Sequence, residues 1–250
     1  MPTAATGEVE APPRIPVRAM GVLFLINLIV AGTATVHMLP RLIVQGDAAA
    51  TAANIVASEW MLHLAVAGDL VAAALDVAVS VLLYVLLRPV DRTLALLMAG
   101  FRLTHIILII ANVQNLLDPL RMLAGDTDLT AFSGEQLPAM AMLSLDEYAD
   151  GWPIGLLFFG VHILLLGYLL YRSGYVPRVL GAWLAVTSLG YFIYSLGHLA
   201  VPGVETSLLL VAPAGVGELA LALLLLFNRV NVPSRGHSQV IPLGDAGRIG

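Results

Sequence analysis

Long apolar runs separated by short polar segments dominate the hydropathy pattern of this chain. A helix rises ~1.5 Å per residue, so roughly 17–25 apolar residues cross the ~30 Å hydrocarbon core of a bilayer. Lipid offers no partner to an unpaired backbone group, and the alternating pattern of barrel strands is absent, so each run should be helical. The pattern predicts an all-α integral membrane bundle of six transmembrane helices, near residues 20–39, 61–87, 93–117, 152–171, 179–200 and 206–228.

Composition supports this class and also marks the ends of the membrane domain. Hydrophobic residues make up 59% of the chain and charged residues only 12%, whereas soluble domains carry about 25% charged residues. The Pro/Ala-rich stretch 1–19 and the polar stretch 231–250 are predicted to be disordered cytoplasmic tails. They flank a six-helix transmembrane domain over residues 20–230. The absence of cysteine excludes disulfides and thiolate metal ligands.

Two segments between the spans are expected to form short exterior amphipathic helices. Gly46 and Asp47 offer a turn before an Ala-rich stretch that favours a helix. The residues from Ser133 to Gln136 fit a capping box that opens a second helix before span four. Both helices are expected to cover the outer ends of the bundle.

The arginines indicate how the bundle is oriented. Twelve arginines and no lysine are present, and basic residues collect on the cytoplasmic side of a membrane. Only Arg41 and Arg121 lie in the loops of the opposite side, so both termini are expected in the cytoplasm and the chain in the cell (plasma or inner) membrane. Because the arginines are scattered in pairs, nucleic-acid binding is excluded. The nine on the predicted cytoplasmic side are Arg14, Arg18, Arg88, Arg92, Arg172, Arg178, Arg229, Arg235 and Arg248.

Several polar side chains lie inside the apolar runs, at similar depths. An ionised side chain facing lipid costs at least ~2.5–3.5 kcal/mol, so these groups are expected to converge inside the bundle. Four different spans contribute to this layer. Its members, our candidates for a buried polar site, are Asp69, Asp76, Arg102, His105, Asn112, His162 and Glu218.

The charges of this layer do not balance. Arg102 is the only fixed cation available to Asp69, Asp76 and Glu218, so at least one proton in the layer is expected to be labile. A structural alternative is that Asp76 and Arg102 form a buried pair that holds spans two and three together. His105 and His162, taken singly, are typical of satisfied contacts between helices.

Span six and the aromatic residues each allow two interpretations. Pro213, five residues before Glu218, predicts a kink of the kind seen in transporter sites. Gly215 and Gly217 equally favour close helix packing. Aromatic residues at the span ends, Tyr148 among them, are interpreted first as anchors in the membrane interface.

The histidines of the chain do not define a metal or cofactor site. His37, His63 and His198 fall near the outer span ends and have the right chemistry for zinc, but their spacing matches no known motif. His105 and His162 are the only support for a haem. No hydrolase, metalloprotease, nucleotide-binding or Rossmann motif occurs. We therefore assign no metal and no cofactor.

Four blocks in order carry a resemblance that covers about residues 21–229: RLIVQGDAAATAANI at 41–55, LLYVLLRPVDRTLALL at 82–97, LLFFGVHILLLGYLLYRSGYVPRVLG at 156–181 and GELALALLLL at 217–226. With these blocks the chain resembles the bacterial membrane family catalogued as domain of unknown function 4386. The resemblance implies a multi-pass helical membrane protein, without an established activity for the family. It matches the polar positions Asp69, Asp76, Arg102, His162 and Glu218, and does not match His37, His63, His105 and His198.

The leading functional hypothesis is transport or permeation of a small solute or protons, with Asp76, Arg102 and Glu218 as a proton-sensitive site. One alternative is an intramembrane enzyme or cofactor holder acting on lipid, with His162 and Glu218 as acid and base. Another is a structural or sensor subunit whose charges only pair with one another. The expected partners are the lipid bilayer, the solute or proton, and other copies of the chain in a homo-oligomer.

Overall fold

The computed structural model describes residues 17–33, 38–124, 132, 134–201, 207–227 and 229–230. Within these residues every regular element is a helix, which confirms the all-α class. Of the predicted tail 1–19, residues 1–16 lie outside the described residues and residues 17–19 belong to the first helix, and the predicted tail 231–250 also lies outside the described residues. The elements are α1 (Val17–Thr33), α2 (Leu39–Leu42), α3 (Ala48–Ala57), α4 (Glu59–Leu87), α5 (Arg92–Asn112), α6 (Gln114–Leu123), α7 (Gln136–Ser173), α8 (Arg178–Thr187), α9 (Leu189–Ala200), the 3₁₀ helix η3 (Leu208–Leu210) and α10 (Ala212–Leu226).

Four helical stretches are long and apolar enough to cross a membrane. They are α4, α5 with α6, α7, and α8 with α9. The helices of predicted spans one and six are shorter, with 17 residues in α1 and 15 in α10, or about 25 and 22 Å at ~1.5 Å per residue. The chain is therefore a multi-helix membrane protein, and six complete spans stay a prediction.

The predicted second exterior helix and span four form one helix of 38 residues, α7. Pro153 lies inside α7 without ending it. A proline removes a single backbone donor, and neighbouring helices can cover the carbonyl that it leaves free. Ser133 of the predicted capping box lies outside the described residues, and Glu135 at the N-cap position makes no side-chain capping bond.

Span six begins at its proline instead of bending there. The helix α10 starts at Ala212, so Pro213 occupies its first turn, where no backbone donor is needed. The indole Nε1 of Trp183 donates to the Pro213 carbonyl at 2.8 Å. The predicted kink is therefore wrong, and Glu218 lies in the second turn of a short helix.

The predicted turn and helix after span one are confirmed. Gly46 adopts a left-handed conformation, with φ at 75°. Asp47 follows it as the N-cap of α3, and its carboxylate accepts a bond from the backbone of Ala50 at 2.9 Å. The helix α3 buries Thr51 and Ile55 against the bundle, so this segment closes part of one end.

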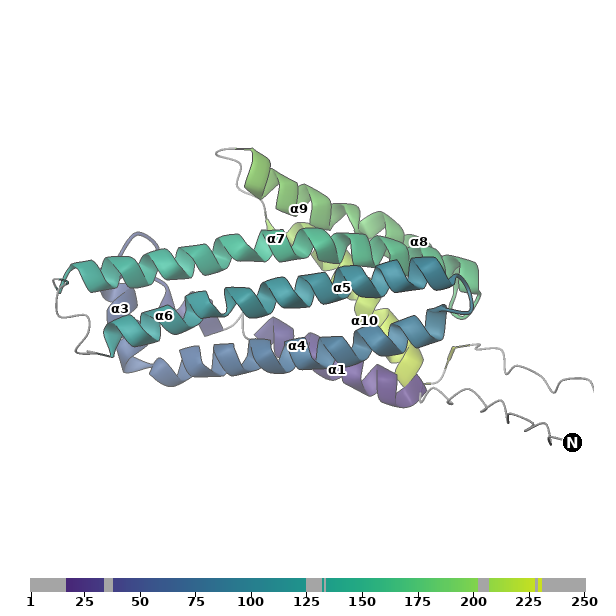
Figure 1. Ribbon diagram of the computed structural model, residues 1–250, viewed down its shortest axis with the longest axis horizontal. Helices are drawn as coiled ribbons and strands as arrows, with labels where there is room; N and C mark the ends of the chain where they lie inside the picture. Colours follow the sequence, from purple (N-terminus) through teal and green to yellow (C-terminus); the bar gives the residue numbers. More distant parts are fainter. Residues whose placement is uncertain are drawn as a thin grey trace, which may run out of the picture.

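The long helices α4, α5 and α7 run side by side, and the two ends of the bundle differ (Figure 1). The α4–α5 and α7–α8 turns, the start of α1 and the end of α10 lie together at one end, with α3 and α6 at the other (Figure 1). Arg88 lies in the first of these turns, and Arg92, Arg172 and Arg178 lie at the helix ends that the two turns join. We call this the arginine-rich end.

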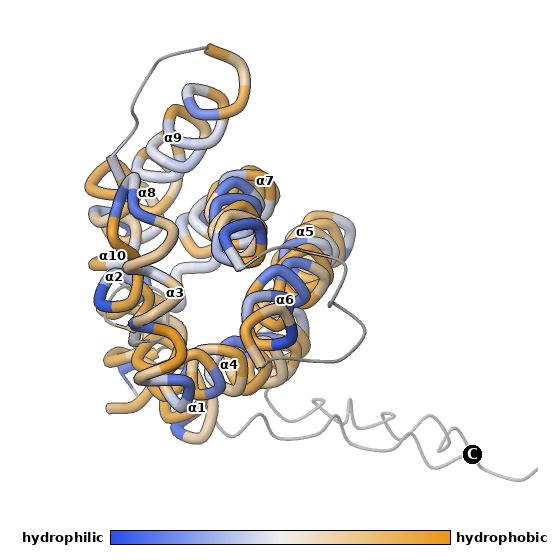
Figure 2. The backbone as a smooth tube through the Cα atoms, turned by 90° about the vertical axis from the view of Figure 1, so that its left-hand side faces the viewer, coloured by the Kyte–Doolittle hydropathy of each residue, from blue (hydrophilic) through white to orange (hydrophobic). Residues whose placement is uncertain are grey.

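Two apolar clusters fill the bundle on either side of its middle. The larger one occupies the arginine-rich half and includes Leu83, Leu87, Leu166 and Leu225. The smaller one, around Ile55, Leu62 and Leu116, lies at the other end. Seen end-on, α1, α4, α5, α7 and α10 surround a common centre (Figure 2). The polar layer lies between these two clusters.

Close packing of α7 and α8 depends on glycine. A Cβ atom on Gly181 would meet the backbone of Tyr171 and the carbonyl of Gly167, whereas one on Gly100 would meet nothing within 4 Å. We expect Gly181→Ala to lower the melting temperature of the purified chain in detergent, because overpacking costs about 1–3 kcal/mol. Gly100→Ala is the matched control and should preserve or raise it, since alanine favours a helix by roughly 0.5–1 kcal/mol. Equal melting temperatures for the two variants would contradict this packing.

Candidate functional site

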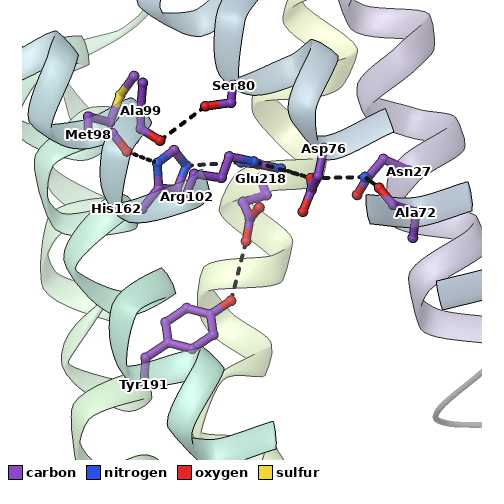
Figure 3. A network of polar contacts seen from close by, with 10 residues as sticks. All are labelled: Asn27, Ala72, Asp76, Ser80, Met98, Ala99, Arg102, His162, Tyr191 and Glu218. Carbon is purple, nitrogen blue, oxygen red and sulfur yellow. Dashed lines mark hydrogen bonds and ion pairs between the residues drawn. The ribbon is translucent and has the colours of Figure 1, made fainter. Parts of the chain in front are cut away.

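Arg102 of α5 lies at the centre of the polar layer, with 1% of its surface exposed. Its Nε donates to Oδ1 of Asp76 in α4 at 3.2 Å, and Nη2 forms a shorter bond to the same oxygen. Its Nη1 donates to Nε2 of His162 in α7 at 2.9 Å. The guanidinium thus links three helices through two side chains (Figure 3).

Two aromatic rings enclose the same guanidinium. Its central carbon lies 5.4 Å from the ring centre of Phe24 in α1 and 5.2 Å from that of Phe159 in α7. A cation over an aromatic face is attracted by the ring quadrupole, more strongly where water is excluded. Arg102 therefore brings α1 into the same assembly as α4, α5 and α7.

His162 is locked into one tautomer by its two partners. A guanidinium can only donate, so Nε2 of His162 accepts from Arg102. Its Nδ1 faces the Met98 carbonyl at 3.0 Å and must carry the proton. Both ring nitrogens are thus used inside the protein, and His162 has none free for a ligand or a reacting group.

Asn27 of α1 completes the surroundings of Asp76. Its Nδ2 donates to Oδ1 of Asp76 and to the Ala72 carbonyl, both at 2.9 Å (Figure 3). Sequence reasoning missed Asn27, although an amide in the middle of an apolar run was a usable signal, since such groups form bonds between helices. Asp76 is consequently held by α1 and α5 together.

Glu218 of α10 has a different environment. Its Oε1 accepts a bond from the hydroxyl of Tyr191 in α9 at 3.3 Å (Figure 3). Only 3% of the residue is exposed, and among the described residues no cationic side chain lies within 4.0 Å of its carboxylate. Glu218 is therefore a buried acid without the counter-charge that Asp76 has.

Asp69 and Asn112 belong to a separate contact, nearer the end opposite the arginine-rich one. The hydroxyl of Tyr148 donates to Oδ2 of Asp69 at 2.6 Å. The side chain of Asn112 donates to the Tyr148 carbonyl at 2.8 Å and packs against Gly151. Tyr148 is 3% exposed, so its interpretation as an interface anchor is wrong. Asp69 does not share Arg102 with Asp76.

A cavity of about 750 Å³ extends from the polar layer toward the end opposite the arginine-rich one. His105 reaches its wall, with its ring 4.9 Å from that of Phe159. Its wall combines polar, aromatic and aliphatic side chains. The lining includes Asn27, Asp76, Arg102, His105, Glu218, Tyr148, Trp152, Phe159, Tyr191, Tyr194, Leu39, Ile43, Leu145, Leu156 and Leu208.

A second hollow of about 40 Å³ lies beside the large one. Asp69 and Asp76 both line it, with His105 and Trp152. Alanine and isoleucine side chains form much of the remaining wall, so the hollow is mostly apolar. The two aspartates of α4, which the sequence placed on one face, therefore border one small hollow without contacting the same cation.

Comparison with known proteins places this arrangement in a family. Residues 19–228 match the family described as "Domain of unknown function (DUF4386)". The chain belongs to the DUF4386 family. A protein of Archaeoglobus fulgidus described as "Uncharacterized protein" is 37% identical over 119 residues, which cover 48% of this chain and 57% of that protein. No solved structure matches the chain.

The outer histidines of this DUF4386 member do not meet in the described structure. His63 lies 3.5 Å from Glu59, and His198 lies 3.0 Å from Asp150. His37 lies outside the described residues. Across the described part of the chain, no group of three His, Asp or Glu side chains could hold a metal ion.

The geometry of this DUF4386 member around Arg102 predicts that a lysine cannot replace it. Lysine keeps the charge but lacks the planar fork that reaches Asp76 and His162 together. We expect Arg102→Lys to lower the melting temperature and the yield of monodisperse protein in detergent, since breaking a buried pair costs about 3–5 kcal/mol. Arg121→Lys serves as control, because Arg121 is 65% exposed. Wild-type stability of Arg102→Lys would show that the fork is not required.

Proposed function

We propose that this DUF4386 protein is a membrane carrier that binds a small solute in the central cavity and exchanges it with a proton at Glu218. The buried Glu218 carboxyl, which has no cationic partner among the described residues and borders a cavity, carries this proposal. In the proposal the arginine-rich end and both termini face the cytoplasm of a cell whose plasma or inner membrane holds the protein.

The cavity has the size that such a role requires. Sites for small molecules typically occupy about 300–1,000 Å³ and are mostly apolar with a few polar groups. The central cavity holds about 750 Å³ and combines aliphatic walls with Asp76 and Glu218. Residues of a single chain line this partly open cavity, so a homo-oligomer is not needed to form its wall and stays an additional proposal.

Charge balance supports Glu218 as the exchanging group. The groups that face it are the Tyr191 hydroxyl from α9, Asp76 from α4 and Arg102 from α5. Asp76 already occupies two donors of Arg102, so one cation stands against two carboxyls. An uncompensated buried carboxylate is costly, and it is relieved by a proton or by a cationic ligand. Occupation by one would displace the other.

The position of Glu218 also supports a carrier. The bonds and ring contacts of Arg102 hold α1, α4, α5 and α7 together. The bond between Tyr191 and Glu218 instead joins α9 to α10. The helix α10 also packs closely against α1, where Gly21 lies against the backbone of Leu226, and α9 packs against α7. A change in the charge of Glu218 would therefore act on the bond between α9 and α10 at the wall of the cavity, where a carrier would couple proton binding to movement.

Two alternatives fit the geometry less well. A lipid-acting enzyme that pairs His162 with Glu218 lacks a free histidine nitrogen, because Arg102 and Met98 occupy both. A purely structural or sensor role is favoured by the Arg102 network, whose donors are satisfied inside the protein. That role gives no reason for the solute-sized cavity at Glu218, so we place it second.

Purified protein in liposomes that contain a pH-sensitive dye tests the carrier. With an acidic interior, we would add ethidium, rhodamine B and anilinonaphthalene sulfonate one at a time, as cationic, zwitterionic and anionic probes. At least one probe should accelerate proton release from wild-type liposomes, and Glu218→Gln should reduce that acceleration by roughly tenfold or more, as expected for loss of a buried charge partner.

The matched control is Glu59→Gln, which removes an acid with 57% of its side chain exposed at the start of α4. It should behave as the wild type does. The carrier proposal fails if folded Glu218→Gln protein, monodisperse on size exclusion, moves protons as fast as the wild type with all three probes.

A further inference from the structure

We infer that the solute is a lipophilic monovalent cation, an amine or quaternary ammonium compound, with Glu218 as its counter-charge. The inference rests on the proposed function and assigns the class of its substrate. Three properties of the cavity carry it: the charge that the cavity leaves uncompensated, the aromatic faces around that charge, and the aliphatic walls beyond them.

The cavity lining has an excess of negative charge. Among the described residues that line it, the charged ones are Asp76, Arg102 and Glu218, which gives a formal sum of −2 + 1 = −1 when both acids are ionised. Arg102 is 1% exposed, donates to Asp76 and His162, and lies between two rings. The positive charge of Arg102 is therefore already paired within the protein. An anionic solute would face two carboxyl groups and would find no unpaired arginine among the described lining residues.

Aromatic side chains are frequent in the cavity lining, and they are Phe159, Tyr191, Tyr194, Trp152 and Tyr148. Phe159 and Tyr191 pack edge to face at 5.4 Å, and the Tyr191 hydroxyl reaches Glu218. Aromatic faces beside a carboxylate attract alkylated ammonium groups, which combine a diffuse positive charge with an apolar surface. This arrangement favours an organic cation over a neutral solute.

The remaining wall argues against an inorganic ion. Leu39, Ile43, Leu145, Leu156 and Leu208 extend the cavity away from the polar layer. Calcium takes 6–8 oxygen ligands and magnesium keeps several waters, needs that two carboxyls in an apolar chamber do not meet. A solute with hydrocarbon groups of its own would cover these leucine and isoleucine side chains. The cavity thus fits an amphiphilic cation with its charged centre near Glu218.

Calorimetric titration of the full chain in detergent tests the sign of the charge with two probes of the same shape. Tetraphenylphosphonium carries one positive charge and tetraphenylborate one negative charge. We expect saturable binding of the phosphonium, and binding of the borate that is roughly tenfold weaker or absent. Equal affinity for the two probes, or tighter binding of the borate, would overturn the inference.

Variants then locate the counter-charge. Glu218→Gln should weaken phosphonium binding by roughly tenfold or more, while Glu59→Gln leaves it unchanged. Glu218→Asp keeps the charge and should keep the preference for the phosphonium. Unchanged phosphonium affinity in folded Glu218→Gln protein would overturn the assignment of Glu218, and the comparison of the two probes on the wild type decides the charge class even where that variant does not fold.

The outcomes separate this inference from the proposed function. Proton release that depends on Glu218 but occurs only with the zwitterionic or anionic probe would support the carrier and overturn the cation class. Phosphonium binding that depends on Glu218, without any proton movement in liposomes, would support the cation class and overturn the carrier.

Discussion

The hydrogen bonds and ring contacts of the Arg102 guanidinium join four helices, and the arrangement of the bundle follows from them. Arg102 is buried between Phe24 and Phe159 and donates to Asp76 and His162. A charge in that position is tolerable only because every one of these contacts is present. The contacts fix the depth of α1, α4, α5 and α7 relative to one another. They also use the one arginine among the described residues of the polar layer.

Once Arg102 is paired in this way, one carboxyl group has no cationic partner among the described residues. Glu218 reaches the layer from α10, bonded to Tyr191, and borders the cavity. The larger apolar cluster fills the arginine-rich half of the bundle, and its members Phe159 and Tyr191 also line the cavity. In our proposal, a bound cation and a bound proton compete for Glu218 in this cavity.

Most residues of this site could be predicted from the sequence, but not all of the hydrogen-bonded pairs that they form. Depth along apolar runs was enough to bring Asp76, Arg102 and Glu218 together, because charge inside a membrane has few tolerable positions. It could not assign Asp69 to Tyr148, since that bond depends on how α4 and α7 are rotated. The positions at which helices begin, end or bend were harder still to predict. Whether Pro213 bends a helix or begins one depends on contacts such as that of Trp183, which lies 30 positions away.

The carrier and its substrate class both depend on loss of a proton from Glu218 when a cation binds. Infrared difference spectroscopy of the purified chain, recorded with and without tetraphenylphosphonium, observes this directly through the carbonyl stretch of protonated carboxyl groups. We expect one such band to disappear on binding, and we expect Glu218→Gln to lack this change. The same change in folded Glu218→Gln protein would show that the exchanging proton belongs to another group.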